Sequence, residues 1–163
     1  MKLEALKLGH GDKVDQLTFF RADGSTSRIT LPRQGILPHD LLHFVVESAL
    51  PFRHGFLSMV ADGADATFAT TALHASDAAA RAAEGAQVEA LVEALQTQLW
   101  AGSFDRAAFL DGMALACAAR DVASPVLSDA DFESLLFDRA VGLNAEWTQL
   151  APRQSLTLVF ERP

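Results

Sequence analysis

The sequence predicts an α+β fold in which an N-terminal antiparallel meander, joined by a C-terminal strand, packs against a mostly helical middle. Three observations support this fold class. Segments near both ends alternate apolar and polar residues, and an Asp23-Gly24 pair separates two such segments. Between Pro51 and Pro125 the chain is rich in alanine and contains no other proline. We expect a single domain over residues 1–163, because no repeat, low-complexity linker or abrupt charge shift divides the chain.

Four segments have the composition of strands. They are Leu3–Leu8, Val14–Arg21, Ser27–Leu31 and Ser155–Glu161. Asp23-Gly24 lies between the second and third segments, and such a pair is the strongest short-range signal of a hairpin. The last segment alternates Leu156, Leu158 and Phe160 with other residues, which is typical of a half-buried strand. We expect this C-terminal strand to join the N-terminal sheet.

The middle of the chain is predicted to be helical. The run from Phe52 to Met59 fits either a strand or a buried helix, and a short helix is expected from Ala64 to Leu73. Ser76-Asp77 can cap the next segment, whose apolar residues recur at helical spacing and which Gly85 is expected to break in two before it closes at Gly102.

Two further helices are expected towards the C-terminus. Ser103 can cap the first, which runs to Arg120, and Ser128-Asp129-Ala130-Asp131 has the pattern of a capping box for the second. The apolar stripe of this last helix consists of Phe132, Leu135, Leu136, Leu143 and Trp147. We interpret Trp147 as a core residue.

The most distinctive predicted helix lies in Leu37–Leu50. Pro38 suits the first helical position, since its missing N–H costs nothing there. At about 100° per residue, His39, His43 and Glu47 follow one another at intervals of one turn, and Asp40 falls on the Glu47 side. The opposite side carries Leu42, Val45, Val46 and Ala49. The helix is therefore expected to bury this apolar side and to carry a narrow polar stripe.

The polar stripe carries two imidazoles and two carboxylates but no lysine or arginine, whereas solvated helix faces usually mix both signs of charge. His39, His43 and Glu47 could bind a divalent metal such as zinc and leave an open position, with Asp40 as a base or as a partner of a ligand. A structural explanation is also available: Asp40 suits the helix N-terminus, and His43 can hydrogen-bond Glu47 at the surface. Proton transfer without a metal is the third interpretation.

Two resemblances involve this helix. His39-Asp40-Leu41-Leu42-His43 is weakly similar to the His-Glu-x-x-His motif of zinc proteases, with Asp40 in place of the general-base glutamate and Glu47 too near to match the distant third ligand. The chain more closely resembles small uncharacterised bacterial proteins that share a Leu-Pro-His-Asp-Leu-x-His-Phe-Val-Val-Glu segment, here Leu37–Glu47, followed by Gly-Phe, here Gly55-Phe56. That family has no assigned function, so this resemblance implies no activity.

Composition narrows the expected partners. A net charge of −8 with 13 scattered lysines and arginines disfavours nucleic acid and anionic membranes. The one cysteine, Cys117, cannot form an internal disulfide and is expected to be buried, which suits a reducing cytoplasm. The N-terminal residues lack the apolar run of a signal peptide, and no segment has the length of a membrane span.

No motif decides whether the protein is an enzyme, because the sequence contains no dinucleotide-binding glycine pattern, P-loop, Cys-x-x-Cys or nucleophile elbow. The first hypothesis is accordingly a non-enzymatic interaction or regulatory protein whose exposed helices mediate self-association into a homo-oligomer. The alternative is a divalent-metal-binding protein, with metal-dependent hydrolysis as its activity, that uses the face formed by His39, His43 and Glu47. A small-ligand pocket between the sheet and the helices is the third hypothesis.

Overall fold

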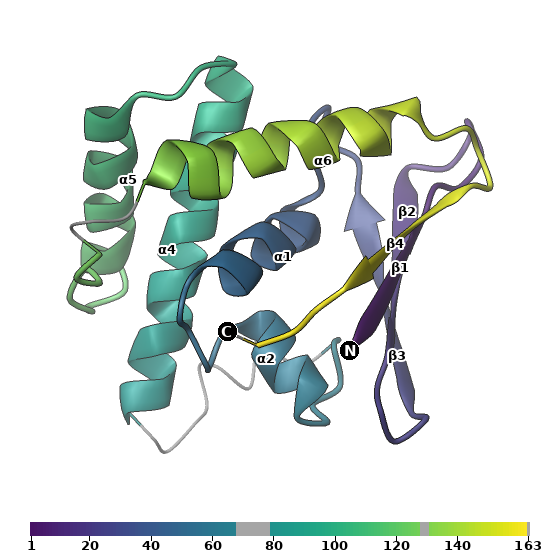
Figure 1. Cartoon of the computed structure of the whole chain (residues 1–163), viewed down its shortest axis with the longest axis horizontal. Coiled ribbons are helices and arrows are strands. Elements are labelled where there is room, and N and C mark those ends of the chain that lie inside the picture. The colour runs from purple at the N-terminus through teal and green to yellow at the C-terminus, as the bar shows by residue number, and fades with distance from the viewer. Residues whose placement is uncertain (68–78, 128–130, 163) are drawn as a thin grey trace.

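The computed structural model describes residues 1–67, 79–127 and 131–162, and it confirms the predicted α+β class. Four strands form one antiparallel sheet in the order β3-β2-β1-β4 (Figure 1). These strands are β1 (Lys2–Leu6), β2 (Val14–Phe20), β3 (Thr26–Pro32) and β4 (Ser155–Val159). The C-terminal strand pairs with β1, as predicted, so segments from both ends of the chain lie side by side and β4 forms one edge of the sheet.

The register of the sheet places its apolar residues on one face. Leu3 of β1 lies opposite Phe19 of β2 on one side and Leu158 of β4 on the other. Leu3 and Phe19 are fully buried, whereas their neighbours along the strands are at least partly exposed. This alternation follows from the two-residue period of a strand, and it gives the helices one apolar face to cover.

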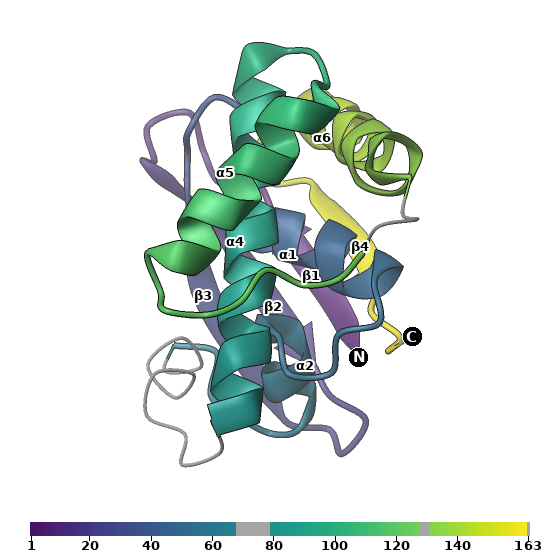
Figure 2. The ribbon, with the colours of Figure 1, turned by 90° about the vertical axis from the view of Figure 1, so that its left-hand side faces the viewer.

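The helices lie on that face (Figures 1 and 2). They are α1 (His39–Ala49), α2 (Phe56–Ala61), α4 (Ala79–Ala101), α5 (Arg106–Ala118), the π-helical turn η1 (Glu133–Phe137) and α6 (Asp138–Gln149). The helix α1 lies between the sheet and the outer helices and packs against α2, α4, η1 and α6. The segment Leu37–Leu50 is therefore the centre of the fold.

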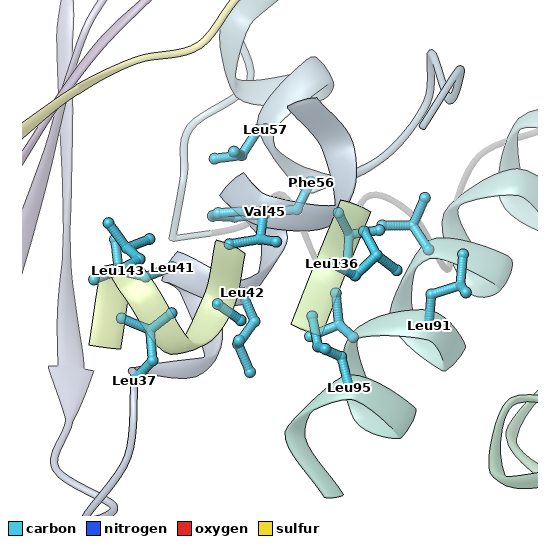
Figure 3. Packing of buried hydrophobic residues seen from close by; sticks show 14 of the residues in the cluster. Leu37, Leu41, Leu42, Val45, Phe56, Leu57, Leu91, Leu95, Leu136 and Leu143 are labelled. Atoms are coloured by element: carbon cyan, nitrogen blue, oxygen red, sulfur yellow. The ribbon is translucent and has the colours of Figure 1, made fainter. Parts of the chain in front are cut away.

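The apolar side of α1 forms the centre of the core. Leu42 and Val45 gather with Leu91 and Leu95 of α4 and with Leu136 of η1 (Figure 3). Four of these side chains are fully buried and Val45 is 2% exposed. Each such burial contributes roughly 1.5–3 kcal/mol to folding, so the position of α1 against α4 is strongly fixed.

Some predicted helix boundaries differ from the structure. The ambiguous run after Pro51 contains the helix α2, and α4 passes through the buried Gly85 without a break. A glycine inside a helix costs about 1 kcal/mol, which the packing of the buried residues of α4 readily offsets. The cap of α5 is Asp105, whose side chain accepts a hydrogen bond from the Ala108 N–H, rather than Ser103. Ala64 and the residues up to 67 are not helical.

Other sequence predictions fall partly or wholly outside the described residues. These are the remainder of the helix expected up to Leu73, the cap at Ser76-Asp77 and the capping-box residues Ser128-Asp129-Ala130. Asp131 is described, and its Oδ1 accepts a hydrogen bond from the Ser134 N–H at 3.2 Å. Asp131 therefore caps the helical turn that begins at Phe132, whereas the N-cap residues of η1 and α6 themselves form no side-chain cap.

The last helix differs from prediction in which residues it buries. The π-helical turn η1 precedes α6, and a π-helix turns through a smaller angle per residue than an α-helix. Leu135, expected in the core, is 37% exposed, while Phe137 is 8% exposed. Trp147, predicted as a core residue, is 5% exposed, so the predicted apolar stripe matches the buried residues after the π-helical turn.

Candidate metal centre

His43 and Glu47 of the polar stripe are buried, contrary to the prediction of a surface hydrogen bond, while His39 and Asp40 are partly exposed. Pro38 is the N-cap of α1, one residue before the predicted position, and its fixed φ of −53° directs the chain into the helix. His43 and Glu47 are 2% and 0% exposed. Their Nδ1 and Oε1 atoms are 3.1 Å apart, which confirms the predicted contact between them but places it inside the protein.

Three side chains from two helices meet beside this contact. His39 and His43 of α1 and Glu89 of α4 each offer one ligand atom, and these atoms all lie within 4.8 Å of one another. Nε2 of His43 is 3.2 Å from Oε1 of Glu89, and Nε2 of His39 is 3.5 Å from Oε2 of the same carboxylate. The packing of α1 on α4 thus supplies the third member of the group.

In each of these imidazoles, the second ring nitrogen, Nδ1, lies beside a hydrogen-bond acceptor. Nδ1 of His39 is 3.1 Å from Oε1 of Gln96, and the Gln96 amide donates to Oε1 of Gln34 at 2.8 Å. Nδ1 of His43 lies against Glu47. An acceptor at Nδ1 favours a proton there, so in the neutral ring the lone pair lies on Nε2, where it could bind a metal ion.

Glu47 is held by backbone groups at the start of α2. Its Oε1 accepts a hydrogen bond from the Leu57 N–H at 3.0 Å, and its Oε2 accepts one from the Ser58 N–H at 3.1 Å. A Cβ atom at Gly55 would come within 2.8 Å of Oε1 and overlap with the carboxylate. Any side chain at position 55 would therefore require this buried carboxylate to move, which accounts for the glycine beside α1.

The charges in this cluster stabilise one another. Burial by itself lowers the pKa of His43, but hydrogen bonds and charges from Glu47 and Glu89 outweigh it and raise the pKa to about 10. For Glu89, burial raises the pKa, while hydrogen bonds and charges from His39 and His43 lower it well below its usual range. Without a metal, the His43 imidazolium therefore bridges two carboxylates.

The predicted site residues separate into two groups. His39 and His43 come together as predicted. Glu47 lies at the Nδ1 edge of the His43 ring and hydrogen-bonds there, so it is not part of the group that could hold a metal. Asp40 is outside the group and lines a pocket beside the edge strand β3; burial raises the pKa of its carboxyl, against the charges of His43 and His39.

Glu89 and Gln96 were not recognised in the sequence. They lie two turns apart on one face of α4, within an apolar pattern that includes Val88 and Leu91. Polar residues at such positions are common on solvated helices, so the spacing alone carried little information. His54, in the loop after α1, is outside the group, and its Nδ1 is hydrogen-bonded to Glu84.

Comparison with protein-family models, curated proteins and solved structures found no significant match to this chain. The resemblance to the bacterial proteins with the Leu37–Glu47 segment thus stays a prediction. Among the described residues, none of the helices combines the length and apolar character needed to cross a membrane.

Proposed function

We propose that the protein binds a divalent metal ion through Nε2 of His39, Nε2 of His43 and the carboxylate of Glu89. The observation that carries this proposal is the orientation of both imidazoles: each directs Nε2 towards Glu89, and each has an acceptor at Nδ1. Histidines that bind metals usually have this second partner, which fixes the ring and increases the basicity of the ligating nitrogen.

The types of ligand favour zinc among the divalent ions. Two imidazoles and one carboxylate form a known set for catalytic zinc, in which a fourth position stays open to water or substrate. A zinc ion there would supply Lewis-acid chemistry and a water of lowered pKa, the requirements of metal-dependent hydrolysis. In this proposal Glu89 takes the place predicted for Glu47, and Glu47 becomes the residue that positions His43.

The second candidate function is that of a non-enzymatic interaction or regulatory protein, which was the first hypothesis from the sequence. It is favoured by two observations. The imidazolium of His43 already neutralises part of the carboxylate charge without a metal, and the large apolar side chains of Leu115 and Val126 are 73% and 92% exposed. Size-exclusion chromatography with light scattering tests the self-association that this function requires; a monomer at every concentration contradicts it.

Elemental analysis and zinc titration test the metal proposal. We expect purified wild-type protein to contain or take up one zinc ion per chain, and the double variant His39→Ala/His43→Ala and the single variant Glu89→Gln to lose it. Glu47→Gln retains all three proposed ligands, so it should weaken zinc binding by only about 10–100-fold. Competition with a chromogenic chelator measures these affinities.

Matched controls separate loss of ligands from general damage. His10→Ala and Glu146→Gln change exposed residues of the same types outside the group and should leave zinc uptake unchanged. Circular dichroism establishes that each variant is folded. Metal-free wild-type protein that resists loading with zinc, iron and nickel would overturn the proposal, and so would a Glu89→Gln variant with wild-type affinity.

A further inference from the structure

A second candidate site lies beside the group formed by His39, His43 and Glu89. A pocket of about 470 Å³ opens between the edge strand β3, the N-terminal turn of α1 and the residues that follow α2. Its lining consists of Gln16, Arg28, Ile29, Thr30, Asp40, Phe56, Ala66 and Thr67. This volume is within the range of small-molecule sites, so the pocket can hold a ligand the size of a few amino-acid residues.

Two side chains of opposite charge line the pocket from different elements. Asp40 belongs to α1 and Arg28 to β3. Within the described part of the chain, the Asp40 carboxylate has no hydrogen-bond partner apart from its own N–H group. Arg28 uses its Nε to bond the Thr18 hydroxyl at 3.2 Å, which leaves the outer guanidinium nitrogens without a described partner. Among the residues that the structure describes, neither side chain has an ion-pair partner, so the pocket offers an anion and a cation to a ligand.

The rest of the lining is amphipathic. Gln16, Thr30 and Thr67 can form hydrogen bonds, while Ile29 and Phe56 provide apolar contact area. The Phe56 ring also packs against the His43 ring, with centroids 5.4 Å apart. A ligand in this pocket would therefore be separated from the proposed metal ligands by a single side chain.

We propose that this pocket binds a short zwitterionic peptide, whose terminal ammonium group meets Asp40 and whose terminal carboxylate meets Arg28. The apolar side chain of the peptide would lie against Phe56 and Ile29. Opposite charges carried by two elements select a ligand with separated charges, because a ligand with only one charge leaves the other protein group unpaired. The proposal requires no metal, so it stands or falls independently of zinc binding.

A matched set of ligands tests the two charge contacts separately. The probes are glycyl-L-phenylalanine, its N-acetyl form, which lacks the ammonium group, and its C-terminal amide, which lacks the carboxylate. Binding to the full chain is followed by nuclear magnetic resonance shift titration, with chelator present and again with zinc. We expect saturable binding of the dipeptide at about millimolar concentration or below, and about tenfold weaker binding of each blocked form.

Protein variants assign each contact to its residue. In Asp40→Asn the N-acetyl form should bind as well as the free dipeptide, and in Arg28→Gln the amide should do so. The exposed residues Glu146 and Arg81 provide the controls Glu146→Gln and Arg81→Gln, which should preserve both tenfold differences. Equal binding of all three probes to wild-type protein, or no saturable binding of the dipeptide, would overturn the proposal. The wild-type comparison needs no variant, so a variant that misfolds leaves the test intact.

Discussion

The contact between Gly55 and Glu47 gives the sharpest prediction for this fold. In Gly55→Ala the added methyl group must displace a fully buried carboxylate that accepts two backbone hydrogen bonds and contacts His43. Overpacking in a core costs about 1–3 kcal/mol, and each hydrogen bond to a charged group contributes about 1.5–3 kcal/mol. If the carboxylate loses one of these bonds, we expect the free energy of unfolding to fall by about 3 kcal/mol.

Thermal and urea unfolding of the metal-free protein, followed by circular dichroism, measures this loss. For a chain of 163 residues, a loss of about 3 kcal/mol corresponds to a decrease in Tm of about 6–12 °C. Gly11→Ala is the matched control, because a Cβ at Gly11 would meet no atom within 4 Å. We expect that control to change stability by less than about 0.5 kcal/mol.

A double-mutant cycle identifies the cause of the Gly55→Ala effect. Glu47→Ala removes the side chain that the new methyl group would strike, so adding Gly55→Ala to it should cost little. The reasoning is refuted if Gly55→Ala is as harmless as Gly11→Ala. It is equally refuted if Gly55→Ala costs the same free energy in the Glu47→Ala background, since the overlap would then not be responsible.

Three other predictions test the core, the positioning of His39 and the charges at the start of α4. Leu42→Ala empties a fully buried site on α1 and should cost about 2–5 kcal/mol in urea unfolding; a cost below 1 kcal/mol would contradict the packing described. Gln96→Ala removes the acceptor at Nδ1 of His39 and should weaken zinc binding by about 10–100-fold in chelator competition, whereas unchanged affinity would exclude a positioning role. Partial burial raises the pKa of Glu84, but hydrogen bonds from His54 and the Arg53 N–H lower it overall, so its stabilising effect exists above the ordinary carboxyl pKa and disappears on acidification. The difference in unfolding free energy between wild type and Glu84→Gln should therefore shrink as the pH falls from about 6 to about 3, and a difference that grows would reverse the sign of this argument.

The fold class could be predicted from the sequence because its signals are local. Alternation along the strands, the Asp23-Gly24 pair and the amphipathic pattern of the segment around Leu42 each depend on residues close together in the chain. The predictions that failed depend on tertiary packing. Gly85 is tolerated because α4 packs against neighbouring helices. The burial of Phe137 follows from a π-helical turn, which the periodicity of the sequence does not predict.

The candidate site could be predicted only in part, for a related reason. The spacing of His39 and His43 follows from the helix period, which the sequence displays. The partner that completes the group, Glu89, comes from another helix about fifty residues later, and only the packing of α1 on α4 brings it near. Glu47 was a reasonable third ligand by spacing, but backbone N–H groups of α2 and Nδ1 of His43 occupy its oxygens.

The charge of the buried cluster favours a divalent ion over the proton that can take its place. Glu47 and Glu89 are both carboxylates in contact with His43, and without a metal the one positive charge between them is the added proton of that imidazole. A divalent ion bound at Nε2 would displace this proton and bring one more positive charge to the same position. Because carboxylates removed from water are costly unless they are compensated, the extra charge should stabilise the cluster. Zinc should consequently raise the unfolding temperature of wild-type protein and leave that of Glu89→Gln nearly unchanged.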